Sequence, residues 1–165
     1  RRAANVEGAK EALKPAAVVA AQTRKRVKRK KRNKRRNKAF VRQGEWFFVP
    51  APELKPKPMW ILKNEPLSRG IGSKPHVVEE LCRFGGETVY VCQAFPRGIR
   101  IERYRKMARK HPDWQWTTMT RDPQVYARGK VRHPDHKTIV LRGWHRVLMN
   151  TENESQAMRQ VVFLD

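Results

Sequence analysis

The feature that most limits how this chain can fold is a run of positive charge between Arg24 and Lys38. Twelve of these fifteen residues are Lys or Arg, and only Val27, Asn33 and Asn37 interrupt them. A hydrophobic core cannot accept such a segment, because each unpaired cation would lose its hydration on burial. Repulsion between the like charges predicts an exposed arm that is disordered or loosely helical until a polyanion neutralises it.

Charge and aromatic residues are distributed unevenly along the chain. Residues 1–43 carry 17 Lys and Arg against two acidic residues, which is +15 of the total net charge of +23. All five Trp and all three Tyr lie after Gly44. We therefore predict a basic nucleic-acid-binding arm over residues 1–43 and a globular domain over residues 44–165. Removal of residues 1–43 is expected to leave that domain folded.

A phosphate-bearing partner is predicted from the density of cations, because each neutralised phosphate releases condensed counterions. The predicted phosphate contacts are Arg24, Lys25, Arg26, Lys28, Arg29, Lys30, Lys31, Arg32, Lys34, Arg35, Arg36 and Lys38. RNA is favoured over DNA, because Arg alternates with Lys and Asn and no helix-turn-helix or zinc-finger module is recognisable. The arm is similar in composition to the basic extensions of ribosomal and other RNA-packaging proteins. This resemblance is compositional and transfers no functional residue.

The predicted function is therefore an RNA-binding component of a ribonucleoprotein assembly, with other proteins of the assembly as further partners. Trp114 and Trp116 are predicted to stack unpaired bases, since they stand beside a basic helix and aromatic stacking suits single-stranded nucleic acid. A DNA-packaging or nucleoid-associated protein is an alternative. Preference for duplex DNA would identify it.

A second alternative, from a different class, is a metal-dependent nuclease. The stretch from His133 to His136 (HPDH) offers two imidazoles and the Asp135 carboxylate as metal ligands or as acid and base. A turn at Pro134-Asp135 and another at Gly143 would place His145 at the far end of the hairpin, about 20 Å away. The preferred interpretation is a structural turn, with no metal, no cofactor and no catalytic residue.

The predicted fold class is α+β, a small and mostly antiparallel β-barrel or sandwich with two short helices, preceded by the basic arm. An apolar stripe predicts one helix over residues 74–84, and a second, basic helix is predicted over residues 101–110. The predicted strands are residues 45–49, 59–63, 87–92, 124–132, 137–142, 144–150 and 160–164, with a further one in WQWTTM (114–119). The glycine-containing connection SRGIGSK (68–74) lacks the spacing of a phosphate-binding loop.

Two cysteines, Cys82 and Cys92, are too few for a disulfide framework or a four-cysteine zinc site. They are expected to be buried free thiols in an intracellular, reducing compartment. No apolar run approaches the length of a membrane span, so a membrane is not an expected partner. The basic, acid-poor start at Arg1 is compatible with removal of an organellar leader.

Overall fold

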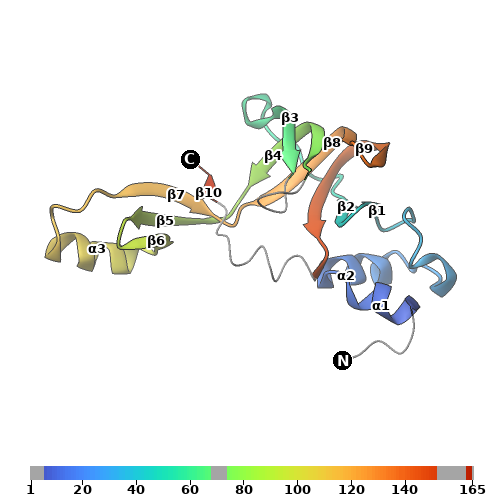
Figure 1. Ribbon diagram of the computed structural model, residues 1–165, viewed down its shortest axis with the longest axis horizontal. Helices are drawn as coiled ribbons and strands as arrows, with labels where there is room; N and C mark the ends of the chain where they lie inside the picture. Colours follow the sequence, from blue (N-terminus) through green and yellow to red (C-terminus); the bar gives the residue numbers. More distant parts are fainter. Residues whose placement is uncertain (1–5, 68–73, 152–162, 165) are drawn as a thin grey trace. The chain divides into compact units, whose positions relative to one another are not determined.

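The computed structural model describes residues 6–67, 74–151 and 163–164 (Figure 1). It is a mixed α+β protein with two antiparallel sheets, and the chain divides into two compact units. The described part of unit 1 consists of residues 6–67, 74–83 and 125–151, and that of unit 2 of residues 84–124 and 163–164. Among the described residues, no helix combines the length and the apolar character needed to cross a bilayer.

Unit 1 is built on a sheet with the strand order β1-β2-β9-β8-β4-β3. Its strands are β1 (Val41–Gln43), β2 (Trp46–Pro50), β3 (Leu62–Leu67), β4 (His76–Phe84), β8 (Gln124–His133) and β9 (His136–Met149). Its helical elements are α1 (Val6–Ala12), α2 (Ala16–Arg24) and the 3-10 helices η1 (Arg29–Lys31) and η2 (Pro58–Trp60). Phe84, the last residue of β4, and Gln124, the first residue of β8, belong to unit 2.

Strand β2 is apolar along its length because the protein covers both of its faces. Trp46 and Phe48 belong to one core cluster of unit 1, whereas Phe47 and Val49 belong to another. Alternate side chains of a strand point to opposite faces, so a strand covered on both sides has a continuous apolar sequence. The sequence WFFV thus reflects two cores that lie on opposite sides of one strand.

The second of these cores is supplied largely by the segment predicted to be a separate arm. Val18 and Ala21 of α2 are buried together with Val27, Ala39 and Phe40, and α2 lies against β2 (Figure 1). The Phe40 ring meets the Phe47 ring edge to face, with centroids 5.1 Å apart. Residues on both sides of the predicted boundary at Gly44 therefore pack in the same core. The assignment of nucleic-acid binding to residues 1–43 stays a prediction.

Unit 2 contains the smaller sheet, with the strand order β10-β7-β5-β6, and one helix. Its elements are β5 (Glu87–Cys92), β6 (Phe95–Ile99), α3 (Ile101–Lys110), β7 (Thr117–Arg121) and β10 (Phe163–Leu164). Helix α3 lies beside β5 (Figure 1). Between the two elements, Tyr104 stacks on Tyr90 with ring centroids 3.9 Å apart. The helix at 101–110 and the strand at 87–92 are confirmed, whereas β6 was not predicted as a strand.

The helix predicted over residues 74–84 is wrong, because this segment forms β4. Its apolar residues are compatible with a helical stripe, but β4 pairs with β3 along Leu62↔Leu81 to Leu67↔His76 and adjoins β8 on the other side. His76 and Val78 are fully buried two residues apart, as expected for a strand. The pairing of β4 with a neighbouring strand on each side outweighed the helical spacing of its apolar residues.

Two predicted strand ends are also wrong. Gly143 was expected to turn the chain, but β9 runs through it, and the glycine has a φ of +80° opposite a register shift in β8. A glycine in that conformation suits a bulge as well as a turn. The strand predicted over residues 59–63 instead covers Leu62–Leu67, and Pro66 lies inside it because β3 is the edge strand of its sheet, where a missing N–H is tolerated.

The α+β class is confirmed, and the barrel is wrong: within the described residues β1 and β3 are the two open edges of the larger sheet. The sandwich alternative stays a prediction. Trp114 and Trp116 precede β7 and do not form part of it. Most of SRGIGSK (68–74) lies outside the described residues. Cys82 and Cys92 are both buried free cysteines.

Candidate nucleic-acid interface

The backbone of the basic segment is tied to α1 and α2 by two buried polar side chains. The ammonium of Lys14 donates to the carbonyl oxygen of Arg32 at 3.0 Å and to Oδ1 of Asn33 at 2.8 Å. Nε2 of Gln22 donates to the same Arg32 oxygen at 2.7 Å. Lys14 also forms an ion pair with Glu11 at 2.7 Å, so its charge is compensated where it is buried.

Helix α2 ends where the positive charge begins. Arg26 has a φ of +47°, and the Val27 N–H bonds back to the Gln22 carbonyl at 2.9 Å, which turns the chain and buries the Val27 side chain. Further along, Oδ1 of Asn37 accepts hydrogen bonds from the N–H groups of Ala39 and Phe40. The three uncharged residues of the segment therefore turn or anchor it, while the cations remain outside.

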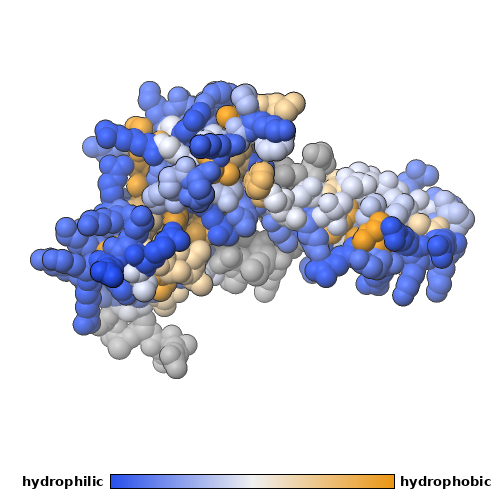
Figure 2. All heavy atoms as spheres, turned by 180° about the vertical axis from the view of Figure 1, so that it is seen from behind, coloured by the Kyte–Doolittle hydropathy of each residue, from blue (hydrophilic) through white to orange (hydrophobic). Residues whose placement is uncertain are grey.

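The predicted phosphate contacts are consequently held on a folded surface. Eleven of the twelve are exposed, and Arg32 is half-buried, with its Nε 3.3 Å from the Val27 carbonyl oxygen. No acidic residue occurs between Glu11 and Glu45 in the sequence. Hydrophilic side chains cover most of the surface visible in Figure 2. The arm, which was expected to be disordered or loosely helical, is therefore partly helical in the described residues and presents a positively charged face built on a core.

A groove of about 840 Å³ opens between the end of this segment, β1 and β9. His136 and His145 line it, together with five cationic side chains, which are Arg35, Arg36, Arg42, Lys137 and Arg142. No carboxylate is among the described residues that line it. Side-chain hydrogen bonds to backbone carbonyls fix its walls: Nη2 of Arg36 donates to the Val140 carbonyl at 3.3 Å, and Nε2 of Gln43 donates to the Lys137 carbonyl at 2.7 Å.

Arg42 is the partly buried cation of the groove, and its pKa is lowered from the usual value. Burial lowers this pKa most, the neighbouring Arg35 charge lowers it further, and Glu45 partly offsets both. The guanidinium of Arg42 also lies over the Phe47 ring, 5.0 Å from its centroid, and donates from Nε to the Gly44 carbonyl at 2.8 Å. The guanidinium is thus held in place beside a like charge, and an anion between them would relieve the repulsion.

His145 contributes a neutral imidazole to the same groove. Burial lowers its pKa, with the Arg36 charge acting in the same direction, although a hydrogen bond with the Gly143 carbonyl at 2.9 Å opposes both effects. That carbonyl can only accept, so Nδ1 carries the proton. His136 lines this groove too, and the two histidines were not expected to share one surface.

Trp114 and Trp116 lie in unit 2, where they pack against other rings. Trp114 stacks on His111 with centroids 4.1 Å apart, and Trp116 stacks on Phe95 at 6.1 Å and meets Tyr104 edge to face at 5.2 Å. Both indoles are half-buried. They form an aromatic cluster with these rings, and their use as base-stacking platforms stays a prediction.

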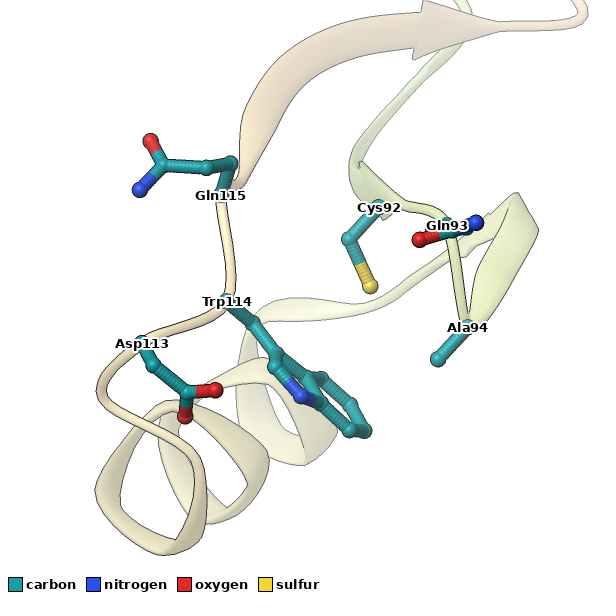
Figure 3. Close-up of a pocket in the computed structure, with 6 residues that line it drawn as sticks. All are labelled: Cys92, Gln93, Ala94, Asp113, Trp114 and Gln115. Atoms are coloured by element: carbon teal, nitrogen blue, oxygen red, sulfur yellow. The ribbon is translucent and has the colours of Figure 1, made fainter.

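One edge of Trp114 borders a pocket of about 590 Å³ in unit 2 (Figure 3). The indole extends toward Ala94 and the Cys92 sulfur points into the space, whereas the Gln115 side chain turns away. Asp113 is the charged residue among those drawn. A pocket with a carboxylate and without a cation is poorly suited to a phosphate, so it adds nothing to the predicted interface.

The residues proposed for the nuclease alternative do not form one ligand set. Asp135 pairs with Lys74, whose ammonium lies 3.1 Å from both carboxylate oxygens, and this pair lowers the Asp135 pKa. His133 and His136 instead approach a third histidine, His76, which sequence reasoning missed. The helix predicted over residues 74–84 hid it, since only the strand β4 places His76 beside the hairpin of β8 and β9.

Comparison with known proteins adds no constraint: no family model, curated protein or solved structure matches this chain. The function is therefore argued from the geometry and charge described above.

Proposed function

We propose that this protein binds nucleic acid through the basic face of unit 1, with RNA preferred over DNA. The observation that supports this most strongly is the groove lined by five cations and by no carboxylate among its described residues. Five Lys or Arg converging on one groove attract a polyanion, and phosphate contacts supply most of the affinity in such complexes. The exposed cations of residues 24–38 extend the same surface.

The preference for RNA rests on the shape of the basic segment. Direct reading of duplex DNA usually places an α-helix or a β-ribbon in the major groove. Between Lys25 and Lys38 the described chain forms the three-residue helix η1, turns and bends, and one isolated β-bridge at Arg36. Such a surface suits contacts with phosphates, riboses and irregular RNA better than base reading in a regular duplex. The most concrete form of the proposal is an RNA-binding component of an intracellular ribonucleoprotein assembly.

The salt dependence of binding tests the groove directly. The variant Arg35→Gln/Lys137→Gln/Arg142→Gln removes three charges from exposed groove residues that are not part of the core. Binding of a fluorescent single-stranded RNA is measured by anisotropy between 50 and 300 mM salt. The slope of log K against log salt should fall by about 2, at about 0.7 per phosphate contact.

A matched control is available in unit 2. The variant Arg105→Gln/Lys106→Gln/Arg109→Gln changes the net charge by the same amount on the exposed residues of α3. Its slope should change by less than about 1. Equal losses in the two variants would show that binding follows net charge and does not use the groove. Tighter binding of duplex DNA than of RNA at equal salt would favour the DNA-packaging alternative.

A further inference from the structure

Three histidines from three different strands converge in unit 1. His76 begins β4, His133 ends β8 and His136 begins β9. One ring nitrogen from each lies within 4.8 Å of the other two. We propose that His76, His133 and His136 bind a divalent transition metal of the zinc type. This inference does not depend on nucleic-acid binding.

The fold brings these rings together for reasons that are local to the sheet. His133 and His136 are directly paired across the β8-β9 hairpin, and their ring centroids are 4.5 Å apart. Strand β4 adjoins β8, which places the His76 ring 4.2 Å from that of His133 and 5.6 Å from that of His136. His76 is 1% exposed, whereas the other two are half-buried. The cluster is therefore buried at His76 and accessible to solvent at His133 and His136.

The spacing fits a metal after a small contraction. A point equidistant from three atoms that are 4.8 Å apart lies about 2.8 Å from each of them. A zinc–nitrogen bond is about 2.0–2.1 Å, so each nitrogen has to move inward by at most about 0.8 Å.

Gly44 provides the space next to two of the rings. A Cβ at this position would lie 2.9 Å from Nε2 of His136 and 3.3 Å from Nε2 of His76. The residue also has a φ of +56°, which disfavours other residues. Both nitrogens thus face the same glycine, and a methyl group there would push them out of place.

The chemistry of the donors decides which ion is expected. Imidazole nitrogen suits Zn²⁺, Co²⁺, Ni²⁺ and Cu²⁺, whereas Mg²⁺ and Ca²⁺ require oxygen ligands. Asp135 is the nearest carboxylate in sequence, but its ion pair with Lys74 occupies it. Three histidines leave the fourth position of a tetrahedral ion to water or to another ligand, as in the zinc sites of enzymes.

One ring nitrogen of His133 already makes the hydrogen bond that usually supports a metal-bound imidazole. Its Nδ1 accepts the Asp135 N–H at 3.1 Å, so Nε2 carries the proton and donates to the Lys74 carbonyl at 3.2 Å. Binding of the metal at Nδ1 replaces the contact with Asp135 and keeps the one with Lys74. A ring N–H donated to a backbone carbonyl is the usual support for a histidine ligand.

The test uses the full chain, first stripped of metal with a chelator. Co²⁺ alone is titrated into the protein, and the visible absorption of four-coordinate Co²⁺ is recorded together with the stoichiometry. One ion per chain is expected. In a parallel experiment with Zn²⁺ alone, nitrogen-15 spectra of the imidazoles should shift for three of the five histidines. This second measurement needs no substitution and so does not depend on how a variant folds.

Substitutions then locate the site. His133→Ala/His136→Ala and Gly44→Ala should each weaken Co²⁺ binding by at least about 10-fold, since disturbing even the supporting residues of a metal site has that effect. His111→Ala, in the aromatic cluster of unit 2, should bind as the parent does. Absorption that persists in the double variant, zinc-induced shifts confined to His111 and His145, or no binding at millimolar Co²⁺ would each overturn the proposal.

Discussion

Replacing Phe40 with Ala tests whether residues 1–43 are part of the fold. Phe40 is 2% exposed and packs edge to face on Phe47, inside the core that α2 shares with β2. Truncation of a buried Phe to Ala costs about 3–5 kcal/mol, of which the ring pair contributes about 0.5–1.5 kcal/mol. The free energy of unfolding of a domain is about 5–15 kcal/mol, so a large part of it should be lost.

Urea denaturation followed by circular dichroism and tryptophan fluorescence measures this loss. With an m-value of about 2 kcal/mol/M, a change of 3–5 kcal/mol lowers the midpoint by about 1.5–2.5 M. Phe84→Ala is the matched control, because the same truncation at a half-exposed ring should cost about 1 kcal/mol or less.

Removal of residues 1–43 extends the same test. The aromatic residues after Gly44 predict that the remaining chain folds alone, whereas the structure predicts that exposure of Phe47 and Val49 abolishes the cooperative transition of unit 1. A loss below about 1 kcal/mol in Phe40→Ala, together with a cooperative transition in the truncated chain, would refute the shared core.

Two further predictions concern the pH dependence and unit 2. Because the pKa of His145 is lowered in the folded protein, the unfolded chain binds a proton at this residue more readily than the folded one. The free energy of unfolding should therefore decrease as the pH falls from about 6.5. The variant His145→Gln should remove this part of the pH dependence. Thermal denaturation at pH 5 to 8 checks it, and an unchanged pH profile in the variant would contradict the assignment. Gly98→Ala should destabilise unit 2 by about 1–3 kcal/mol or more, because its φ is +73° and a Cβ would lie 2.6 Å from Val89 Cγ2. Gly85→Ala, with a φ of +73° but open space around the Cβ, separates the backbone strain from the clash in the same urea experiment.

The sequence was informative wherever short-range signals decided the structure. Strand β5 and helix α3 were predicted with their observed bounds, since ETVYVC alternates and the basic helix lies between Gly98 and Pro112. Net charge and its concentration between Arg24 and Lys38 also follow from composition alone. These properties require no knowledge of which segments meet in space.

Pairing and packing across long distances decided the rest. Val77, Val78, Leu81 and Cys82 satisfy the spacing of a helix, and only the neighbouring strands β3 and β8 made that segment a strand. The same pairing placed His76 beside His133 and His136, a cluster that no local spacing contains. The basic segment is folded for a similar reason: its few apolar residues look too sparse for a core, but β2 and β9 supply the other half of it. A pattern read along one segment cannot show the partner that buries it, because the free energy of burial comes from contacts between segments.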